Sequence, residues 1–572
     1  MGIKAHTVVN FDMEHASSKI FHLIIIKPTH YDDDGYPIRW FRSLIPSNSL
    51  ASINGLGMDC RSRKVLGEEV DIRLHALDET SMHINPQRLI RMIERDRAQA
   101  LIAIVGVQSN QFPRAVDIAR PFRTRGLPVC IGGFHVSGCL AMLDEMPAGM
   151  AEAQELGISF FAGEAEEGRF EVVLKHAYRG ELKPIYNYLD QLPDMPGQPV
   201  PFIDGKVVAR TTGCVSSFDL GRGCPFRCTF CTIINVHGQK SRFRTADDLE
   251  RIIRANHEHG INQFFITDDN IVRNRNWEEL FDRLIWLRRE ERIELRLLIQ
   301  VDMMCHRVPR FIQKAVEAGV DQVFVGMESI NVDNLVAAGK PQNRIDEYRE
   351  MLLAWKKFPV VLTAGYIFGF PNDRKSTFLQ EVETIKRELP IDLIYFTYLT
   401  PLPGSEDHKA QVEQGRWMEE DINRYDLNHR VTHHSQMSDT EWEKGYREAW
   451  KRFYSFEHMT TVMQRMYALG SNKKRTTVNR LCLYGYFPAY RGIHPLEGGL
   501  LRLRGRKERR PIFPREHPLI FYPKNTYKQF VEVLGFFLFW LRLRVVRRRI
   551  ERDPKRREYS DQAIAAGHSM MP

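Results

Sequence analysis

The chain has 572 residues, of which 43% are hydrophobic and 27% are charged, and this composition excludes collagen-like, disordered and multi-span membrane proteins. The formal net charge of +9 is unevenly distributed. Residues 501–572 carry 18 basic and 7 acidic side chains, a net +11, whereas the first 500 residues carry 63 and 65, a net −2. The basic charge therefore belongs to a tail, which argues against a broad nucleic-acid-binding surface on the main domains.

The cysteine content and the N-terminal segment predict a reducing compartment. Nine cysteines make an odd number that suits no disulfide framework, and six of the nine are scattered. The first 18 residues are polar and contain no apolar core of a secretory signal. We therefore expect a cytoplasmic protein, and peripheral contact with the inner membrane face is left open for the tail.

The first 185 residues alternate short apolar runs with stretches of helical spacing. This alternation is typical of βαβ units and predicts a doubly wound parallel sheet over residues 18–185. Ligands of such sheets bind beyond the carboxyl ends of the strands. The expected strands are residues 20–28, 70–74, 101–107, 128–131 and 160–162.

A second alternating region follows a proline-rich linker, residues 186–209. Six β-then-α units over residues 210–405 predict a partial (β/α)6 barrel with its active site at the carboxyl ends of the strands. Residues 406–495 are expected to form a helical domain, with an amphipathic helix at 438–455, and residues 496–572 a basic tail with an amphipathic helix. The expected barrel strands are residues 218–221, 263–267, 295–301, 322–326, 361–368 and 393–398.

Three cysteines crowd into eight residues after the first expected barrel strand, as Cys224-Pro-Phe-Arg-Cys228-Thr-Phe-Cys231. Three thiolates can hold three irons of a [4Fe–4S] cluster and leave the fourth iron open for a small molecule. A closed zinc site, the alternative, would need four ligands in paired spacing, and His237 is the one nearby substitute.

This Cys-x3-Cys-x2-Cys motif resembles that of the radical S-adenosylmethionine (SAM) superfamily, and the resemblance covers residues 210–405. It implies a cluster that binds SAM and cleaves it to a radical that abstracts hydrogen from carbon. Three further segments resemble family motifs at strand ends, except that Asn372 replaces the expected Glu of the third. The resemblance implies SAM contacts from Asp268, Asp269, Asn270, Glu328, Ser329, Gly365, Ile367 and Gly369.

Within this superfamily, the N-terminal region resembles the cobalamin-binding subgroup. The resemblance implies cobalamin contacts from Ser109, Gly132, Gly133 and His135. No Asp-x-His-x-x-Gly segment is found, so a histidine ligand below the cobalt is not expected, although His30 lies in the corresponding loop. A domain that keeps the fold without the cofactor is the alternative, and His30 and His135 could equally be surface-loop histidines.

The leading functional hypothesis is a radical SAM enzyme that uses cobalamin to methylate an unactivated carbon of a small or lipid-like metabolite. The alternatives are a radical cyclase acting on a tetrapyrrole or other ring, and a non-catalytic cobalamin or redox sensor. An RNA methylthiotransferase is disfavoured because the other cysteines are too scattered for a second cluster. We expect an electron donor such as flavodoxin or ferredoxin and no nucleic acid, and no catalytic side chain is identified.

The tail contains a nine-residue apolar run, residues 533–541, followed by an arginine cluster. A membrane span needs about 20 mostly apolar residues, so this run is too short to cross a bilayer. Two hypotheses for residues 529–552 stay open, namely an interfacial helix on anionic lipid and a helix docked on the protein itself.

Overall fold

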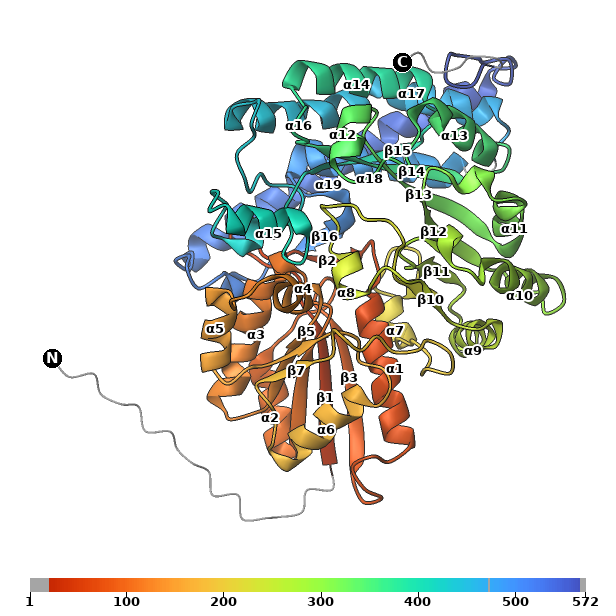
Figure 1. Cartoon of the computed structure of the whole chain (residues 1–572). Helices are drawn as coiled ribbons and strands as arrows, with labels where there is room; N and C mark the ends of the chain where they lie inside the picture. The colour runs from red at the N-terminus through yellow and green to blue at the C-terminus, as the bar shows by residue number, and fades with distance from the viewer. Residues whose placement is uncertain (1–19, 472–473, 566–572) are drawn as a thin grey trace.

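A computed structural model describes residues 20–471 and 474–565, with the side chains at 474 and 475 left out. The start of the first predicted domain and the polar segment used to exclude a secretory signal fall on residues 1–19, outside this range. Two six-stranded sheets organise the fold (Figure 1). The first is built from residues coloured red to orange-yellow, and the second from residues coloured yellow-green to teal.

The first sheet is parallel throughout and has the strand order β3-β1-β4-β5-β6-β7. The order reverses at β1, which pairs with both β3 and β4, so the loops after β1 and β4 diverge and leave a crevice there. The last strand, β7, extends into the segment expected to be a linker. The strands are β1 (Ile20–Lys27), β3 (Asp71–Asp78), β4 (Gln99–Ile104), β5 (Val129–Gly132), β6 (Ser159–Ala162) and β7 (Ile185–Asn187).

Helices cover both faces of this sheet, as the apolar strand β1 requires. Leu23 and Ile25 face a core shared with α1 and α6, whereas Ile24 and Ile26 face a core shared with α2, α3 and α5. Burial on both faces explains why the strands are apolar runs rather than alternating patterns. The helices are α1 (Asn48–Ser62), α2 (Pro86–Arg95), α3 (Phe112–Thr124), α4 (Phe134–Met142), α5 (Ala148–Glu155) and α6 (Arg169–Arg179).

The second sheet is also parallel and has the order β15-β14-β13-β12-β11-β8, so each strand pairs with the next one along the chain. This is the expected partial (β/α)6 barrel. Its strands are β8 (Val215–Phe218), β11 (Gln263–Ile266), β12 (Arg296–Val301), β13 (Val320–Glu328), β14 (Val361–Phe368) and β15 (Leu393–Tyr398). Its helices are α9 (Ala246–His257), α10 (Trp277–Arg289), α11 (Phe311–Ala318), α12 (Val332–Ala337), α13 (Tyr348–Lys356) and α14 (Lys375–Glu388).

The remainder of the chain is mainly helical. Helix α16 begins after a capping box in which Ser438 and Glu441 exchange side-chain to backbone hydrogen bonds. The helices are α15 (Glu406–Glu413), α16 (Asp439–Phe453), α17 (Phe456–Ala468), α18 (Lys474–Arg491) and α19 (Pro518–Arg552). Short elements complete the described chain, namely α7 (Gly205–Val208), α8 (Ile233–Val236), β9 (Gly221–Arg222) and β10 (Arg242–Phe243).

Two features of the tail differ from the sequence-based expectation. The last helix, α19, has 35 residues and begins well before the expected residue 529. The strand β16 (Gly499–Leu503) pairs antiparallel with β2 (Arg39–Ser43), so the tail adds a ribbon to the N-terminal domain. A search of the described residues finds no helix of the length and apolar character that crossing a membrane requires.

Candidate active site

A cavity of about 740 Å³ lies between the two sheets. The N-terminal domain lines it with the loops that follow β1, β4, β5 and β6, at the carboxyl ends of the strands. The barrel lines it from β9, α8 and the ends of β11 and β12, and the C-terminal region closes a third side. Both predicted ligand-binding edges therefore open into one chamber.

Glycines form much of the N-terminal wall. Gly132 and Gly133 line the cavity together with Gly106 and Gly163. At Gly133, φ is +145° and an added Cβ would lie 2.2 Å from the backbone nitrogen of Val107, so no other residue fits. The wall is thus bare backbone that a large ligand can approach closely.

Ser109 and His135, the other two residues expected to contact a cobalamin, differ in whether they reach the cavity. Ser109 lines the cavity, whereas His135 is buried behind it and is absent from the lining. His135 Nδ1 lies 3.2 Å from Ser109 Oγ, and burial lowers the pKa of His135 to about 3. His135 is therefore a neutral positioning residue for Ser109, and it is not a surface-loop histidine.

The cysteine loop lies between β9 and α8 and is fixed by backbone hydrogen bonds. The Cys224 amide donates to the Gly238 carbonyl at 3.2 Å, and the Cys231 amide donates to the Cys228 carbonyl at 3.1 Å. The Cys224 charge raises the pKa of both Cys228 and Cys231, and the Cys228 charge raises the pKa of Cys231. Burial and this repulsion raise the pKa of Cys228 to about 11 and that of Cys231 to about 12.

Of the three residues after β11 that are expected to contact SAM, two are buried in hydrogen bonds within the protein and one lines the cavity. Asp268 is buried, its carboxylate accepts from the Leu220 amide at 2.6 Å, and burial raises its pKa to about 7. Asn270 is also buried and donates to Asp302. Asp269 alone lines the cavity, and it accepts from the Gly223 amide at 2.8 Å, directly before the first cysteine.

The segment after β13 places a charged pair beside the cysteines. Glu328 has a left-handed backbone, with φ of +66°, and it accepts from Lys340 Nζ at 2.6 Å. The Lys340 charge lowers the pKa of Cys228, opposing the effect of burial. Ser329 is buried and its hydroxyl accepts from the Asn331 amide, which holds the turn.

The third expected SAM segment forms the end of β14. Ile367 belongs to a small apolar cluster with Phe370 and with Phe230, which lies inside the cysteine motif. Gly365 and Gly369 are required by packing, because an added Cβ would lie 2.8 Å from the Phe324 ring and 2.1 Å from the Trp442 ring, respectively.

A carboxylate near the position of the missing family Glu comes from the residue after Asn372. Asp373 accepts from the Gly369 and Phe370 amides at 2.8 and 3.0 Å and from the Asn334 side chain at 2.6 Å. The sequence analysis overlooked Asp373 because the family motif places its carboxylate at position 372, one residue earlier. These three hydrogen bonds make Asp373 a buried support of the turn after β14.

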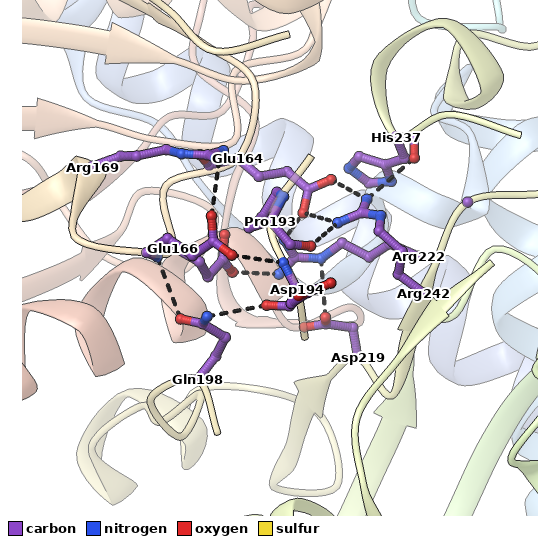
Figure 2. Close-up of polar contacts among 12 residues, drawn as sticks. Glu164, Glu166, Arg169, Pro193, Asp194, Gln198, Asp219, Arg222, His237 and Arg242 are labelled. Carbon is purple, nitrogen blue, oxygen red and sulfur yellow. Dashed lines mark hydrogen bonds and ion pairs between the residues drawn. The ribbon is translucent and has the colours of Figure 1, made fainter. Parts of the chain in front are cut away.

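A buried ion network joins the two domains, and Figure 2 shows Glu164 and Glu166 of the N-terminal domain turned towards barrel arginines. Arg222 donates to Glu164 at 2.5 Å, to Glu166 at 2.6 Å and to Asp219 at 3.0 Å. Arg242 also contacts Glu164. Nothing in the local sequence of Glu164 and Glu166 indicates this interdomain contact, so the sequence analysis missed it.

A second polar cluster, formed by His30, Asn110, Asp426 and Glu497, lies on the cavity wall. His30 Nδ1 lies 3.3 Å from Glu497 Oε1, and Asn110 donates to the same oxygen at 3.1 Å. Burial lowers the pKa of His30 to about 4 and raises the pKa of Glu497 far above its usual range. Burial therefore favours the neutral form of both groups.

Residues 219–385 match the Radical SAM superfamily model. The chain carries a radical SAM domain. The match includes the cysteine loop and the strands from β11 to β14, and it supports the [4Fe–4S] cluster and SAM expected from the sequence, while ligation of the cluster by the three cysteines stays a prediction. The four-ligand zinc alternative is thereby set aside.

Curated relatives with similar sequences include several methyltransferases and, at 22% identity over 45% of this chain and 42% of that protein, the anaerobic magnesium-protoporphyrin IX monomethyl ester cyclase of Cereibacter sphaeroides. The chain is 27% identical to bacteriochlorophyllide d C-12(1)-methyltransferase of Chlorobaculum tepidum over 53% of its own length and 64% of that protein's. It is 23% identical to hopanoid C-2 methylase of Rhodopseudomonas palustris over 60% and 63% of the two lengths. The chain thus spans slightly less than two thirds of each of these two methyltransferases.

Solved structures with the same fold extend beyond the radical SAM domain. TsrM of Kitasatospora setae, determined with cobalamin and a [4Fe–4S] cluster bound, aligns with a TM-score of 0.51 at 15% identity over 69% of this chain and 75% of that one. OxsB, determined with aqua-cobalamin bound, aligns with a TM-score of 0.51 at 12% identity over 95% and 82%. The resemblance to the cobalamin-binding subgroup is confirmed at the level of fold.

The radical SAM domain has residues that fit the cofactors of its family. Cys228 is buried and Cys224 and Cys231 are partly buried, and burial disfavours their thiolate forms, so a cationic iron centre would stabilise the deprotonated thiols. The loop supplies three ligands, as a cluster with one open iron for SAM requires. On the opposite wall, the glycine-lined strand ends leave space for a large flat ligand.

Proposed function

We propose that this protein is a cobalamin-dependent radical SAM methyltransferase that methylates an unactivated carbon of a small or lipid-like metabolite. The observation that carries the proposal is one cavity of about 740 Å³, lined on the barrel side by Arg222 and Thr232, which flank the cysteine loop, and on the other side by the glycine-rich edge of the N-terminal sheet. Methyl transfer by this chemistry needs both cofactors to face one substrate. The names of the more similar curated relatives support methylation, and the cyclase among the relatives is more distant.

When bound, the cluster with SAM would supply the radical that removes a hydrogen atom from carbon, and cobalamin would supply the methyl group. In our proposal, Cys224, Cys228 and Cys231 hold three irons. Asp269 fixes the Gly223 amide at the start of the cysteine loop and faces the cavity. Lys340 places a positive charge beside Cys228 that favours its thiolate form.

The cobalamin would lie against Ser109, Gly132 and Gly133, and His135 would orient the Ser109 hydroxyl from behind. The ion network of Arg222 with Glu164 and Glu166 would hold the two walls together and exclude water at their junction. Exclusion of water protects a reactive radical from side reactions.

Anaerobic reconstitution with iron, sulfide and cobalamin provides the test. Reduced protein, with flavodoxin or ferredoxin as the electron donor, is expected to cleave SAM to 5′-deoxyadenosine. Incubation with cell extract and methyl-labelled SAM should give a labelled product by mass spectrometry. Failure to cleave SAM would leave only the non-catalytic sensor hypothesis, whereas cleavage with an altered but unlabelled product would favour a radical cyclase.

A further inference from the structure

Helix α19 carries an unusual share of the exposed apolar side chains of the molecule. In the part of the chain that the structure describes, 23 large hydrophobic residues are exposed, and twelve of them lie on this one helix. Tyr527 is 72% exposed and Phe530 is 64% exposed. The twelve are Leu519, Ile520, Tyr522, Tyr527, Phe530, Val531, Val533, Leu534, Phe537, Leu538, Leu541 and Val545.

This helix is apolar on two opposite faces. One face packs against α17 and α18, beside which Figure 1 draws the helix in blue, and it buries Phe521, Leu543 and Ile550. The other face is a stripe at successive spacings of three or four residues, and the stripe is exposed along its whole length. Packing of α19 against α17 and α18 therefore accounts for one of its two apolar faces and leaves the other exposed. The stripe consists of Tyr527, Phe530, Leu534, Phe537, Leu541 and Val545.

The same stripe continues into arginines at the same helical spacing. Arg548 and Arg552 follow Val545 by three and seven residues, and Arg549 lies beside them; all three are exposed. Within residues 20–471 and 474–565, no ion pair is found for these three arginines. One of the two glutamates of the helix, Glu532, is already paired with Arg491.

We propose that α19 lays this stripe onto the surface of a bilayer that contains anionic lipid. An apolar face that ends in unpaired arginines suits the boundary between acyl chains and negatively charged headgroups. No described helix is apolar and long enough to span a bilayer, so α19 would lie in the plane of the surface. A second copy of the chain is a poorer partner, because it offers the same arginines and no free carboxylate on this stripe.

Co-sedimentation of the full chain with phosphatidylcholine vesicles, with and without phosphatidylglycerol, tests the proposal. We expect binding to the anionic vesicles, with weaker binding to phosphatidylcholine alone. The triple variant Phe530→Ser/Leu534→Ser/Phe537→Ser should reduce partitioning at least about tenfold, since burial of each such side chain contributes about tenfold or more. Its matched control is Val332→Ser/Val336→Ser on α12, whose side chains are 61% and 60% exposed.

The charge contribution needs a separate variant. Arg548→Gln/Arg549→Gln/Arg552→Gln should weaken binding to anionic vesicles and leave binding to phosphatidylcholine unchanged. A matched control removes three exposed arginines of the N-terminal domain, Arg88, Arg91 and Arg120. Salt at about 1 M, where the screening length is about 3 Å, should reproduce the loss seen in the charge variant.

Circular dichroism and sedimentation velocity without vesicles accompany each variant, so that loss of folding is recognised. Wild-type protein that stays in the supernatant with anionic vesicles would overturn the proposal. Equal partitioning of the wild type and the triple serine variant would do so as well. A wild-type dimer that the triple variant dissociates, without vesicle binding, would identify a second copy as the partner instead. These outcomes do not depend on the proposed catalytic activity.

Discussion

Replacement of Arg222 by methionine is the sharpest test of the interdomain ion network. The guanidinium is buried and donates to Glu164, Glu166 and Asp219. Removal of one partner from a buried ion pair costs about 3–5 kcal/mol, because the remaining charge stays buried without compensation. Three carboxylates lose this partner in Arg222→Met, although Glu164 keeps Arg242 and Asp219 keeps a hydrogen bond from the Asn48 side chain. We expect a cost at or above the upper end of that range at pH 7.5.

The pH dependence gives this prediction a specific sign. Burial opposes ionisation of Glu164, but Arg222 and Arg242 outweigh burial and lower its pKa. In the wild type, this contribution to stability is present above the unfolded pKa of about 4.5 and is lost as the pH falls through the lower folded pKa. Without Arg222, burial raises the pKa values of the carboxyl groups that it had paired. Protonation then removes the cost of a buried unpaired charge, by about 1.4 kcal/mol per pH unit for each group that takes up a proton.

Urea unfolding followed by tryptophan fluorescence at pH 7.5 and pH 5 measures both effects. The free-energy difference between wild type and Arg222→Met should shrink by about 1–3 kcal/mol at the lower pH. The control is Arg307→Met, whose ion pair with Glu347 is at the surface and should contribute less than about 1 kcal/mol. A cost at pH 7.5 no larger than that of the control, or the same cost at both pH values, would refute the reasoning.

Three further predictions concern the cysteine loop and the cavity walls. Cys228→Ser should remove iron, sulfide and visible absorption from the reconstituted protein, whereas exposed Cys214→Ser should leave all three unchanged. Gly133→Ala should weaken cobalamin binding more than tenfold and lower the melting temperature, because the added Cβ would collide with backbone atoms. The control is Gly126→Ala, whose added Cβ has no neighbour, so this variant measures the cost of a positive φ alone. The stability of Glu497→Gln relative to wild type should increase as the pH rises from 5 to 8. Burial raises the pKa of Glu497, so in this pH range the wild-type carboxyl group ionises only in the unfolded state. Parallel curves of stability against pH for the two proteins would contradict this prediction.

The strands could be predicted because their signals are local. Runs such as residues 361–368 are buried on both faces, so the whole strand is apolar and its ends are marked by glycine or charge. The proximity of Cys224, Cys228 and Cys231 could also be predicted, because residues separated by so few positions in the sequence must lie close together in space. Fold class and the cysteine site therefore followed from the sequence.

Contacts between distant segments could not be predicted in this way. Nothing in Arg39–Ser43 indicates that its partner lies at Gly499–Leu503, more than 450 residues away. His135 has no local feature that distinguishes a buried support of Ser109 from a ligand. The acidic partners of Arg222 come from two domains, and a single sequence holds no signal that pairs them.

The position of α19 links the tail to the cavity through a short path. Helix α19 packs beside β16, and β16 pairs with β2, whose Trp40 and Ser43 line the cavity. Glu497 and Gly498, which directly precede β16, line it as well. A helix at a lipid surface would thus be connected to one wall of the chamber by a few residues of hydrogen-bonded ribbon. A lipid-like substrate is the class of molecule for which this arrangement has a physical advantage, because such a substrate is concentrated where α19 would bind.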